Sequence, residues 1–385
     1  SGESLKIDLD VTNLKMNLDM GSYELFSSTS IVDSKTLQDR DLGAYFGPFL
    51  GVDDMPIYLA DSADAEQFTQ ELRVNTRLDG PLQFLVGAFY QDYKRKAGQK
   101  MTFEGASALD PFGGALLFES AFGDNLKQLA FFGEASYDLT EQLTAVVGVR
   151  HYDYEKDSPD ENDGVFNGGY SEGFVENDDT GQTYKLSLNY RPDESTSFYG
   201  TFAQGFRLGG PHPEIPSDIC DTTGVPDQID SDELDSFEVG AKFAFADGRA
   251  TLNVSAFQVD WTGIPVKRIL DCGFETIANA GEAQSKGMEL EGQLLLADAW
   301  RLDYGLSYTQ AELTEDSAPL NAQSGDRLPG SPEFSASLGL QADFDMAGRP
   351  MFARADIAHV GEYYNNLQES GLAAGDFTTI NLSLG

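Results

Sequence analysis

The chain has 385 residues, of which 64 are acidic and 25 basic, so its formal net charge at pH 7 is -39. Such a charge argues against nucleic acid or an anionic membrane surface as a partner, because both would be repelled. The mean hydropathy is -0.32, and no window approaches the roughly 18 consecutive apolar residues that a membrane-spanning helix requires. A membrane-spanning barrel escapes this exclusion because half of each strand faces water.

Apolar residues recur at every second position, which is the period of a half-buried strand. The pattern begins at residues 5–11, turns near 20–22, and continues over 23–32. A second predicted pair covers 68–78 and 82–93, joined through Asp-Gly-Pro. These patterns predict antiparallel hairpins with tight turns.

Short turns and long connections alternate along the rest of the chain. The short turns are expected near 138–141, 192–195, 246–248, 297–299 and 346–348, and the long segments at 34–65, 97–125, 155–180, 207–232, 262–282, 314–329 and 361–376. Because a strand reverses direction at every turn, strict alternation puts all short turns at one rim and all long loops at the other.

The apolar face and the polar face of each strand indicate which environment each side meets. Between residues 288 and 296 the even positions are mostly apolar, whereas Glu289, Glu291 and Gln293 lie between them. The sequence therefore predicts an all-β fold, a transmembrane antiparallel up-and-down β-barrel of about fifteen strands in the bacterial outer membrane, with short periplasmic turns and long extracellular loops. Aromatic residues near the short turns predict a girdle at the membrane interface, comprising Tyr137, Tyr190, Phe198, Tyr199 and Trp300.

Soluble all-β folds explain the pattern less well. A β-propeller would repeat at blade length and a β-solenoid at a shorter period, and neither repeat is visible. A two-layer sandwich rarely needs so many consecutive hairpins with one rim so much longer than the other.

About fifteen strands is an odd number, and the last expected strand runs from Asp376 to Gly385 with its pattern unbroken. Open edges in lipid would expose unpaired backbone groups, so a stable barrel is expected to need more strands than this chain supplies. The chain starts at Ser1 without a signal peptide, which predicts a mature or truncated form.

Several stretches together resemble the barrel domain of TonB-dependent outer-membrane receptors. They are QFTQELRV (67–74), FLVGAFYQ (84–91), FYGTFAQGFRLGG (198–210), DELDSFEVGAKF (232–243), NVSAFQVDW (253–261), NAGEAQSKGMELEGQ (279–293) and GDRLPGSPEFSASLGL (325–340). The resemblance implies that residues 1–385 form one partial barrel domain of a 22-stranded type. It also implies a plug domain and a closing strand that are absent here, and TonB as a partner acting through the absent N-terminal region.

The same resemblance implies a receptor and transporter for a scarce nutrient rather than an enzyme, energised by TonB and embedded in outer-membrane lipid and lipopolysaccharide. The expected cargo is a ferric siderophore or related iron chelate, with haem, cobalamin or an oligosaccharide as alternatives, and no cofactor is expected. A passive porin and a loop-mediated surface adhesion protein remain alternative functions.

Candidate substrate-binding residues are aromatic or basic side chains expected near the long-loop mouth, where basic residues stand out against the acidic background. They are Tyr45, Phe46, Arg207, His212, Trp261, Lys267, Arg268, Tyr363 and Tyr364. Arg207, Lys267 and Arg268 would meet an anionic iron chelate through charge-assisted hydrogen bonds. The alternative for each is a strand-end charge that balances a nearby carboxylate.

The two cysteines, Cys220 and Cys272, fall in neighbouring long loops. Such a pair would form a disulfide in an oxidising compartment, and two unpaired thiols are the alternative. The sequence carries no metal-ligand motif and no catalytic motif of the HExxH, GxSxG, P-loop or CxxC kinds.

Overall fold

The structure is a computed structural model, and it describes residues 3–44, 57–103 and 116–385 apart from 213–214, 216, 218–219, 227, 280, 318–321, 366 and 368–372. The side chains at 211, 266–269 and 275 also lie outside what is described. The predicted residues Tyr45 and Phe46 fall outside the described residues. No helix within the described ranges is long and apolar enough to cross a membrane.

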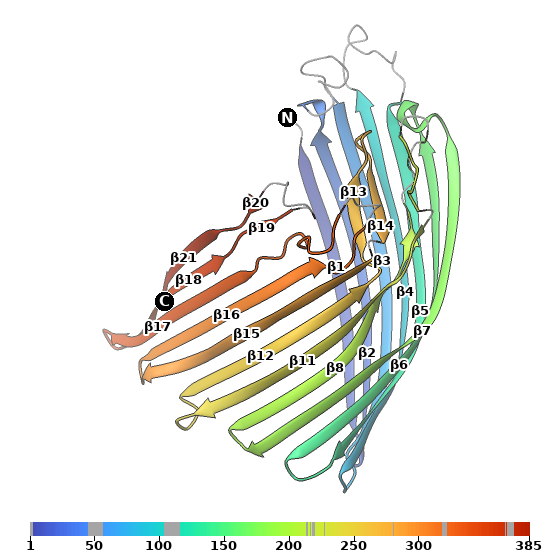
Figure 1. Cartoon of the computed structure of the whole chain (residues 1–385). Helices are drawn as coiled ribbons and strands as arrows, with labels where there is room; N and C mark the ends of the chain where they lie inside the picture. The colour runs from blue at the N-terminus through green and yellow to red at the C-terminus, as the bar shows by residue number, and fades with distance from the viewer. Residues whose placement is uncertain are drawn as a thin grey trace.

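One antiparallel sheet of 15 strands dominates the molecule, and almost every strand pairs with its neighbour in sequence. The strands are β1 (Ser4–Asp19), β2 (Tyr23–Asp41), β3 (Ile57–Thr76), β4 (Leu82–Phe103), β5 (Phe118–Asp138), β6 (Leu143–Asp163), β7 (Ser171–Asp193), β8 (Thr196–Arg207), β11 (Asp232–Phe245), β12 (Ala250–Thr262), β15 (Glu282–Ala297), β16 (Trp300–Leu313), β17 (Phe334–Met346), β18 (Arg349–Val360) and β21 (Phe377–Leu384). The sheet curves strongly, and β1 and β21 form its two edges (Figure 1). The predicted up-and-down arrangement of about fifteen strands is confirmed.

Among the described residues, three small hairpins and one short helix occupy connections at the long-loop end of the sheet. The hairpins pair β9 (Gly210–Pro211) with β10 (Gln228–Ile229), β13 (Pro265–Ile269) with β14 (Glu275–Asn279), and β19 (Tyr363–Tyr364) with β20 (Ala373–Ala374), and the helix η1 spans Val165–Asn167. Figure 1 shows β13 and β14 inside the curve of the sheet. We call this the inner face of the sheet, and the opposite side the outer face.

Side-chain alternation divides the two faces as the sequence predicts. On β11 the outer face carries Phe237 and Val239, whose side chains are 47% and 61% exposed. Glu238 and Lys242 occupy the inner face of the same strand, because successive residues of a strand point to opposite sides. Exposed apolar side chains over so many strands indicate a surface that faces lipid rather than water.

The strands of the first half extend farther than the sequence pattern predicts. The segments expected as loops at 34–65, 97–125 and 155–180 lie largely in strands, and the connections between strands shrink to 42–56, 104–117 and 164–170. At these positions both faces carry polar residues, as with Glu155 and Lys156 of β6. The alternation that marks a strand is therefore lost, although the backbone ladder needs no apolar side chains to continue.

One member of the predicted aromatic girdle lies on the wrong side of the sheet. Tyr137, Tyr190, Phe198 and Trp300 are 41–45% exposed near the short turns. Tyr199 instead faces inward, where its hydroxyl donates to Glu238 and Lys242 lies over its ring. Because Tyr199 follows Phe198 directly, the two side chains must point to opposite faces.

Candidate functional site

Two long connections fold onto the inner face of the sheet at its long-loop end. We call the described residues of 208–231 and 263–281 the mouth segments. The hydroxyl of Tyr154 on β6 lies 3.0 Å from the hydroxyl of Ser231, and Lys156 donates to the carbonyl oxygen of Gly209 at 3.3 Å. These contacts attach the first mouth segment to the same face of β6 that carries Tyr154 and Lys156.

Aromatic packing reinforces this attachment. The rings of Tyr152 and Phe206 stack with 3.6 Å between their centroids. Tyr152, Tyr154 and Ala130 form a buried cluster against which Phe206 and Leu208 pack. The core of this region therefore lies between the inner face of the sheet and the start of the first mouth segment, which fixes where that segment begins.

Burial of Tyr154 also changes the pKa of its phenol. Its neighbours in sequence, Asp153 and Glu155, are exposed on the outer face, so this level of β6 lies beyond the apolar band. Burial raises the pKa of the Tyr154 phenol, and a hydrogen bond with Ser231 opposes that rise. The phenol therefore stays neutral and serves as a hydrogen-bonding anchor for the first mouth segment.

A disulfide joins the two mouth segments. Cys220 and Cys272 are bonded, with 5.4 Å between their Cα atoms and a sequence separation of 52. The imidazole of His212 links the same two segments, because its Nε2 accepts from the backbone N–H of Ile277 at 3.0 Å and lies 2.7 Å from the hydroxyl of Thr276. The two segments are therefore held together by one covalent link and by polar contacts at a second place.

A buried carboxylate organises the strand ends from which the mouth segments leave. Asp232, only 2% exposed, accepts from Arg207 Nε at 2.9 Å and from Trp261 Nε1 at 2.7 Å. These residues lie at the ends of three neighbouring strands, β8, β11 and β12. Two of the predicted site residues, Arg207 and Trp261, are thus brought together, but they act on Asp232, which the sequence reasoning did not select.

A cavity of about 840 Å³ lies between the mouth segments and the inner face of β4, β5 and β6. Arg207 and His212 are the predicted residues that line it, together with Asp124, Lys156 and several apolar side chains. Sequence reasoning missed Lys156 because its segment was interpreted as an acidic loop. The signal available in the sequence was the alternation at 152–156, where Tyr152, Tyr154 and Lys156 share one face and Asp153 and Glu155 the other.

Other predicted residues do not line this cavity or cannot be placed in it. Tyr363 and Tyr364 form β19, where the guanidinium of Arg327 lies 5.7 Å from the ring centre of Tyr364. Lys267 and Arg268 lie in β13, but their side chains are not among the described atoms. Within the described part of the chain, no group of three or more His, Cys, Asp or Glu side chains could hold a metal ion.

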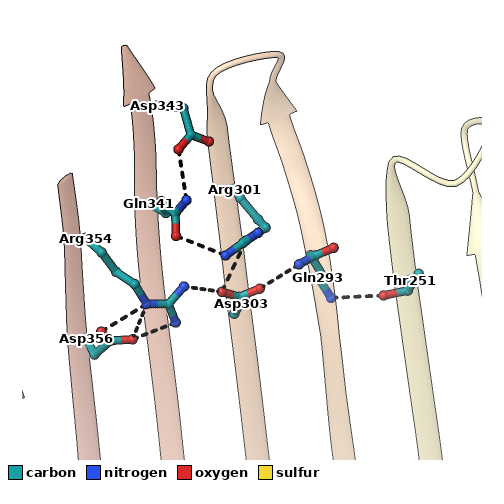
Figure 2. Close-up of polar contacts among 8 residues, drawn as sticks. All are labelled: Thr251, Gln293, Arg301, Asp303, Gln341, Asp343, Arg354 and Asp356. Atoms are coloured by element: carbon teal, nitrogen blue, oxygen red, sulfur yellow. Dashed lines mark hydrogen bonds and ion pairs between the residues drawn. The ribbon is translucent and has the colours of Figure 1, made fainter. Parts of the chain in front are cut away.

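A second polar cluster crosses the inner face near the short-turn end, over β12 and β15 to β18 (Figure 2). Asp303 accepts from Arg354 at 2.7 Å and from Gln293 at 2.9 Å. Arg354 also donates to Asp356 at 3.0 Å, and a cavity of about 450 Å³ lies beside these residues. Every cation and carboxylate named here already has a partner, so this cluster connects strands rather than presenting free groups to a solute.

The sequence profile described as "TonB dependent receptor-like, beta-barrel" matches residues 4–385. The pesticin receptor of Yersinia enterocolitica is 24% identical over 322 residues, which cover 83% of this chain and 44% of that protein. Among solved structures, the ferric yersiniabactin uptake receptor FyuA from Yersinia pestis matches with a TM-score of 0.81 and 19% identity, covering 100% of this chain and 55% of that one. The siderophore receptor PiuA from Acinetobacter baumannii matches with a TM-score of 0.75 and 17% identity, covering 99% of this chain and 58% of that one.

The two structural matches share the fold of the whole sheet, and the chain spans about half the length of the relatives that it matches. The profile match covers nearly all of the chain and agrees with the antiparallel sheet, its apolar outer face and its polar inner face. The chain therefore belongs to the TonB-dependent receptor-like β-barrel family of the outer membrane.

Proposed function

We propose that residues 1–385 act as the barrel domain of an outer-membrane receptor that takes up a scarce metal chelate of the siderophore class, with energy supplied through TonB. The observation that carries the proposal is the cavity of about 840 Å³ between the inner face of the sheet and the disulfide-linked mouth segments. Ligand sites for small molecules commonly have volumes of about 300–1,000 Å³. The names of the relatives, a ferric yersiniabactin uptake receptor and a siderophore receptor, support the same class of cargo.

The position of the cavity suits capture from outside the cell. It lies at the long-loop end, where a rigid sheet holds the connecting segments around a solute. Arg207 and His212 line it, and Trp261 acts behind Arg207 through their shared carboxylate, Asp232. Direct ligand contact by Tyr45, Phe46, Lys267, Arg268, Tyr363 and Tyr364 stays a prediction.

A passive porin is the alternative from another functional class, and the adhesion protein is a third. A porin needs an open passage and gains nothing from two mouth segments tied together over a cavity. An adhesion protein needs exposed loops, whereas the mouth segments described here fold inward onto β6. Both features favour a receptor that holds a solute before it is moved.

Uptake of radiolabelled iron bound to siderophore mixtures tests the proposal in cells that make the full-length gene product. Accumulation that stops when TonB is deleted supports the receptor, whereas diffusive accumulation unaffected by that deletion supports the porin. The variant Phe122→Ala, which alters the cavity lining, should reduce uptake, and Phe131→Ala on the outer face of the same strand is its matched control. Equal uptake by both variants would contradict the role of the cavity.

A further inference from the structure

The described cations of the mouth cavity are already paired before any ligand arrives. Lys156 lies 3.3 Å from Asp124, and Arg207 binds Asp232 through Nε at distances of 3.1 and 2.9 Å. His212 accepts at Nε2 from the backbone N–H of Ile277, so this ring nitrogen is already engaged within the mouth segments. A ligand anion would therefore have to compete with a carboxylate for each of these two cations.

Two further carboxylates make the described lining acidic as a whole. Asp160 and Asp230 also line the cavity, so the described part of the lining contains four carboxylates and, in Lys156 and Arg207, two side-chain cations. Like charges at short range are costly when water is excluded, and a site can reject a ligand by placing such charges against it. The lining consequently opposes a highly charged anionic ligand.

The remaining lining is rich in apolar and aromatic groups. Phe118 and Phe122 come from the inner face of β5, and Phe274 and Ile277 come from the second mouth segment. The rings therefore approach the cavity from two opposite sides. Aromatic side chains bind aromatic ligand groups by stacking and edge-to-face contacts, in addition to the gain from burial of apolar surface.

We propose that the mouth cavity selects a ligand that bears aromatic rings and carries no net negative charge, and that it discriminates against polyanionic chelates. This inference rests on the proposed receptor function and gives that site its substrate class. Of the two roles expected for Arg207, it favours a strand-end charge that balances a nearby carboxylate over contact with an anionic iron chelate, because Arg207 is paired with Asp232.

Three ferric complexes distinguish the effect of aromatic rings on binding from the effect of ligand charge. Ferric tris(benzohydroxamate) is neutral and aromatic, ferric tris(acetohydroxamate) is neutral without rings, and ferric tris(catecholate) is aromatic and trianionic. Binding to the purified full-length gene product is measured by quenching of tryptophan fluorescence. The neutral aromatic complex should bind at least about tenfold more tightly than either of the others, which corresponds to about 1.4 kcal/mol.

Substitutions of the lining residues test whether the cavity causes this ligand preference. Asp160→Asn combined with Asp230→Asn should tighten binding of the trianionic complex several-fold and leave the neutral aromatic complex unchanged. Phe118→Leu combined with Phe122→Leu should weaken only the two aromatic complexes. Asp153→Asn, on the outer face of β6, is the matched control for charge and should change none of the affinities.

Equal or tighter binding of the trianionic complex by the unaltered protein overturns the inference, as does failure of the neutral aromatic complex to bind. A charge preference that persists unchanged in the double Asn variant also overturns it. TonB-dependent iron uptake by cells is a separate readout, so the receptor function can hold while this ligand preference fails.

Discussion

The guanidinium of Arg207 lies over the ring of Trp261, with 4.6 Å between Cζ and the ring centre, and both side chains donate to Asp232. Arg207 and Trp261 are far apart in sequence and come from two strands that flank β11. One carboxylate therefore forms an ion pair with the guanidinium of Arg207 and accepts a hydrogen bond from the indole N–H of Trp261. It also connects the strand ends at which both mouth segments begin.

Asp232→Ala should loosen these strand ends without unfolding the sheet. Breaking a fully buried ion pair costs about 3–5 kcal/mol, but the side chain of Arg207 is 54% exposed, so a local cost of about 1–2 kcal/mol is expected after solvent screening. Hydrogen exchange at residues 205–210 and 230–233 measures the effect. Asp235→Ala is the matched control, because the Asp235 carboxylate on the same strand accepts from the neutral Gln204 at 2.9 Å. Equal exchange in the two variants would refute the organising role of Asp232.

Replacement of Cys220 and Cys272 by serine should release the mouth segments from each other. A disulfide stabilises by about 2–4 kcal/mol, mainly because it restricts the unfolded chain. The described backbone amides of the two mouth segments should exchange faster in the double variant, while those of β11 and β12 keep their protection. The matching chemical test is alkylation of the unaltered protein, which should label both thiols only after reduction. Labelling without reduction would show that the pair is not bonded.

The sequence predicted the sheet well because the alternation of apolar and polar side chains follows directly from a membrane on one face. Phe237 and Val239 mark an outer face that any strand in lipid must present. The alternation is lost at the long-loop side of the apolar band, where Asp153 and Lys156 on opposite faces are both polar although β6 continues. The pattern indicates the environment of a strand rather than the strand itself.

The candidate site was harder to predict because register, rather than local pattern, brings its members together. Arg207 and Trp261 could be selected individually as a cation and an aromatic residue at strand ends. Their common partner Asp232 is one of many acidic residues in an acidic chain, and nothing local distinguishes it. Only the pairing of β8, β11 and β12 shows that it lies between the other two.

Gly292→Ala should destabilise the barrel, although the outer face at this position is broadly exposed. A methyl carbon placed on Gly292 would lie 2.1 Å from the carbonyl oxygen of Thr251, to which the hydroxyl of Tyr304 also donates at 3.2 Å. Since backbone must move to relieve that clash, a cost of about 1–3 kcal/mol is expected. Heat-dependent electrophoretic mobility, which separates folded from unfolded barrels, reports the loss.

Gly200→Ala is the matched control for this change. It also lies on the outer face, and an added methyl carbon would lie 3.7 Å from its nearest neighbour, a methyl group of Val239. Its barrel should remain as stable as the unaltered one or gain slightly, because alanine restricts the unfolded chain more than glycine does. Similar losses of stability in both variants would contradict a special role for the contact between Tyr304 of β16 and Thr251 of β12, which passes over β15.

Arg354 and Asp303 should show a measurable coupling in a double-mutant cycle. Their atoms are 2.7 Å apart, and the side chains are only 25% and 31% exposed within the inner-face cluster of Figure 2. Single and double alanine variants, compared by the temperature of barrel unfolding, should give a coupling of about 1 kcal/mol. The exposed pair of Arg249 and Asp298, at 2.8 Å and with Asp298 94% exposed, should give almost none. A larger coupling for the exposed pair would contradict the reasoning from burial.

The pKa of Asp19, which lies at the short turn between β1 and β2, should depend on Arg77, which directly follows β3. The backbone N–H of Gly21 donates to Asp19 at 2.8 Å and Arg77 at 2.6 Å, and these contacts lower the pKa of the Asp19 carboxyl. A lowered pKa in the folded protein means that the carboxylate stabilises the turn above its unfolded pKa, and that this stabilisation is lost as the pH falls through the folded pKa.

Arg77→Gln should raise the pKa of Asp19 only part of the way toward its ordinary value, because the hydrogen bond from Gly21, the largest single cause, remains. Titration of the side-chain carboxyl by nuclear magnetic resonance measures the change. Asp193 is the internal control, since its pKa is lowered at another short turn by hydrogen bonds from Ser195 and needs no arginine. An Asp19 titration unchanged by the substitution would assign the whole effect to the turn backbone. A parallel shift of Asp193 would instead point to a general change in the charge of the short-turn rim.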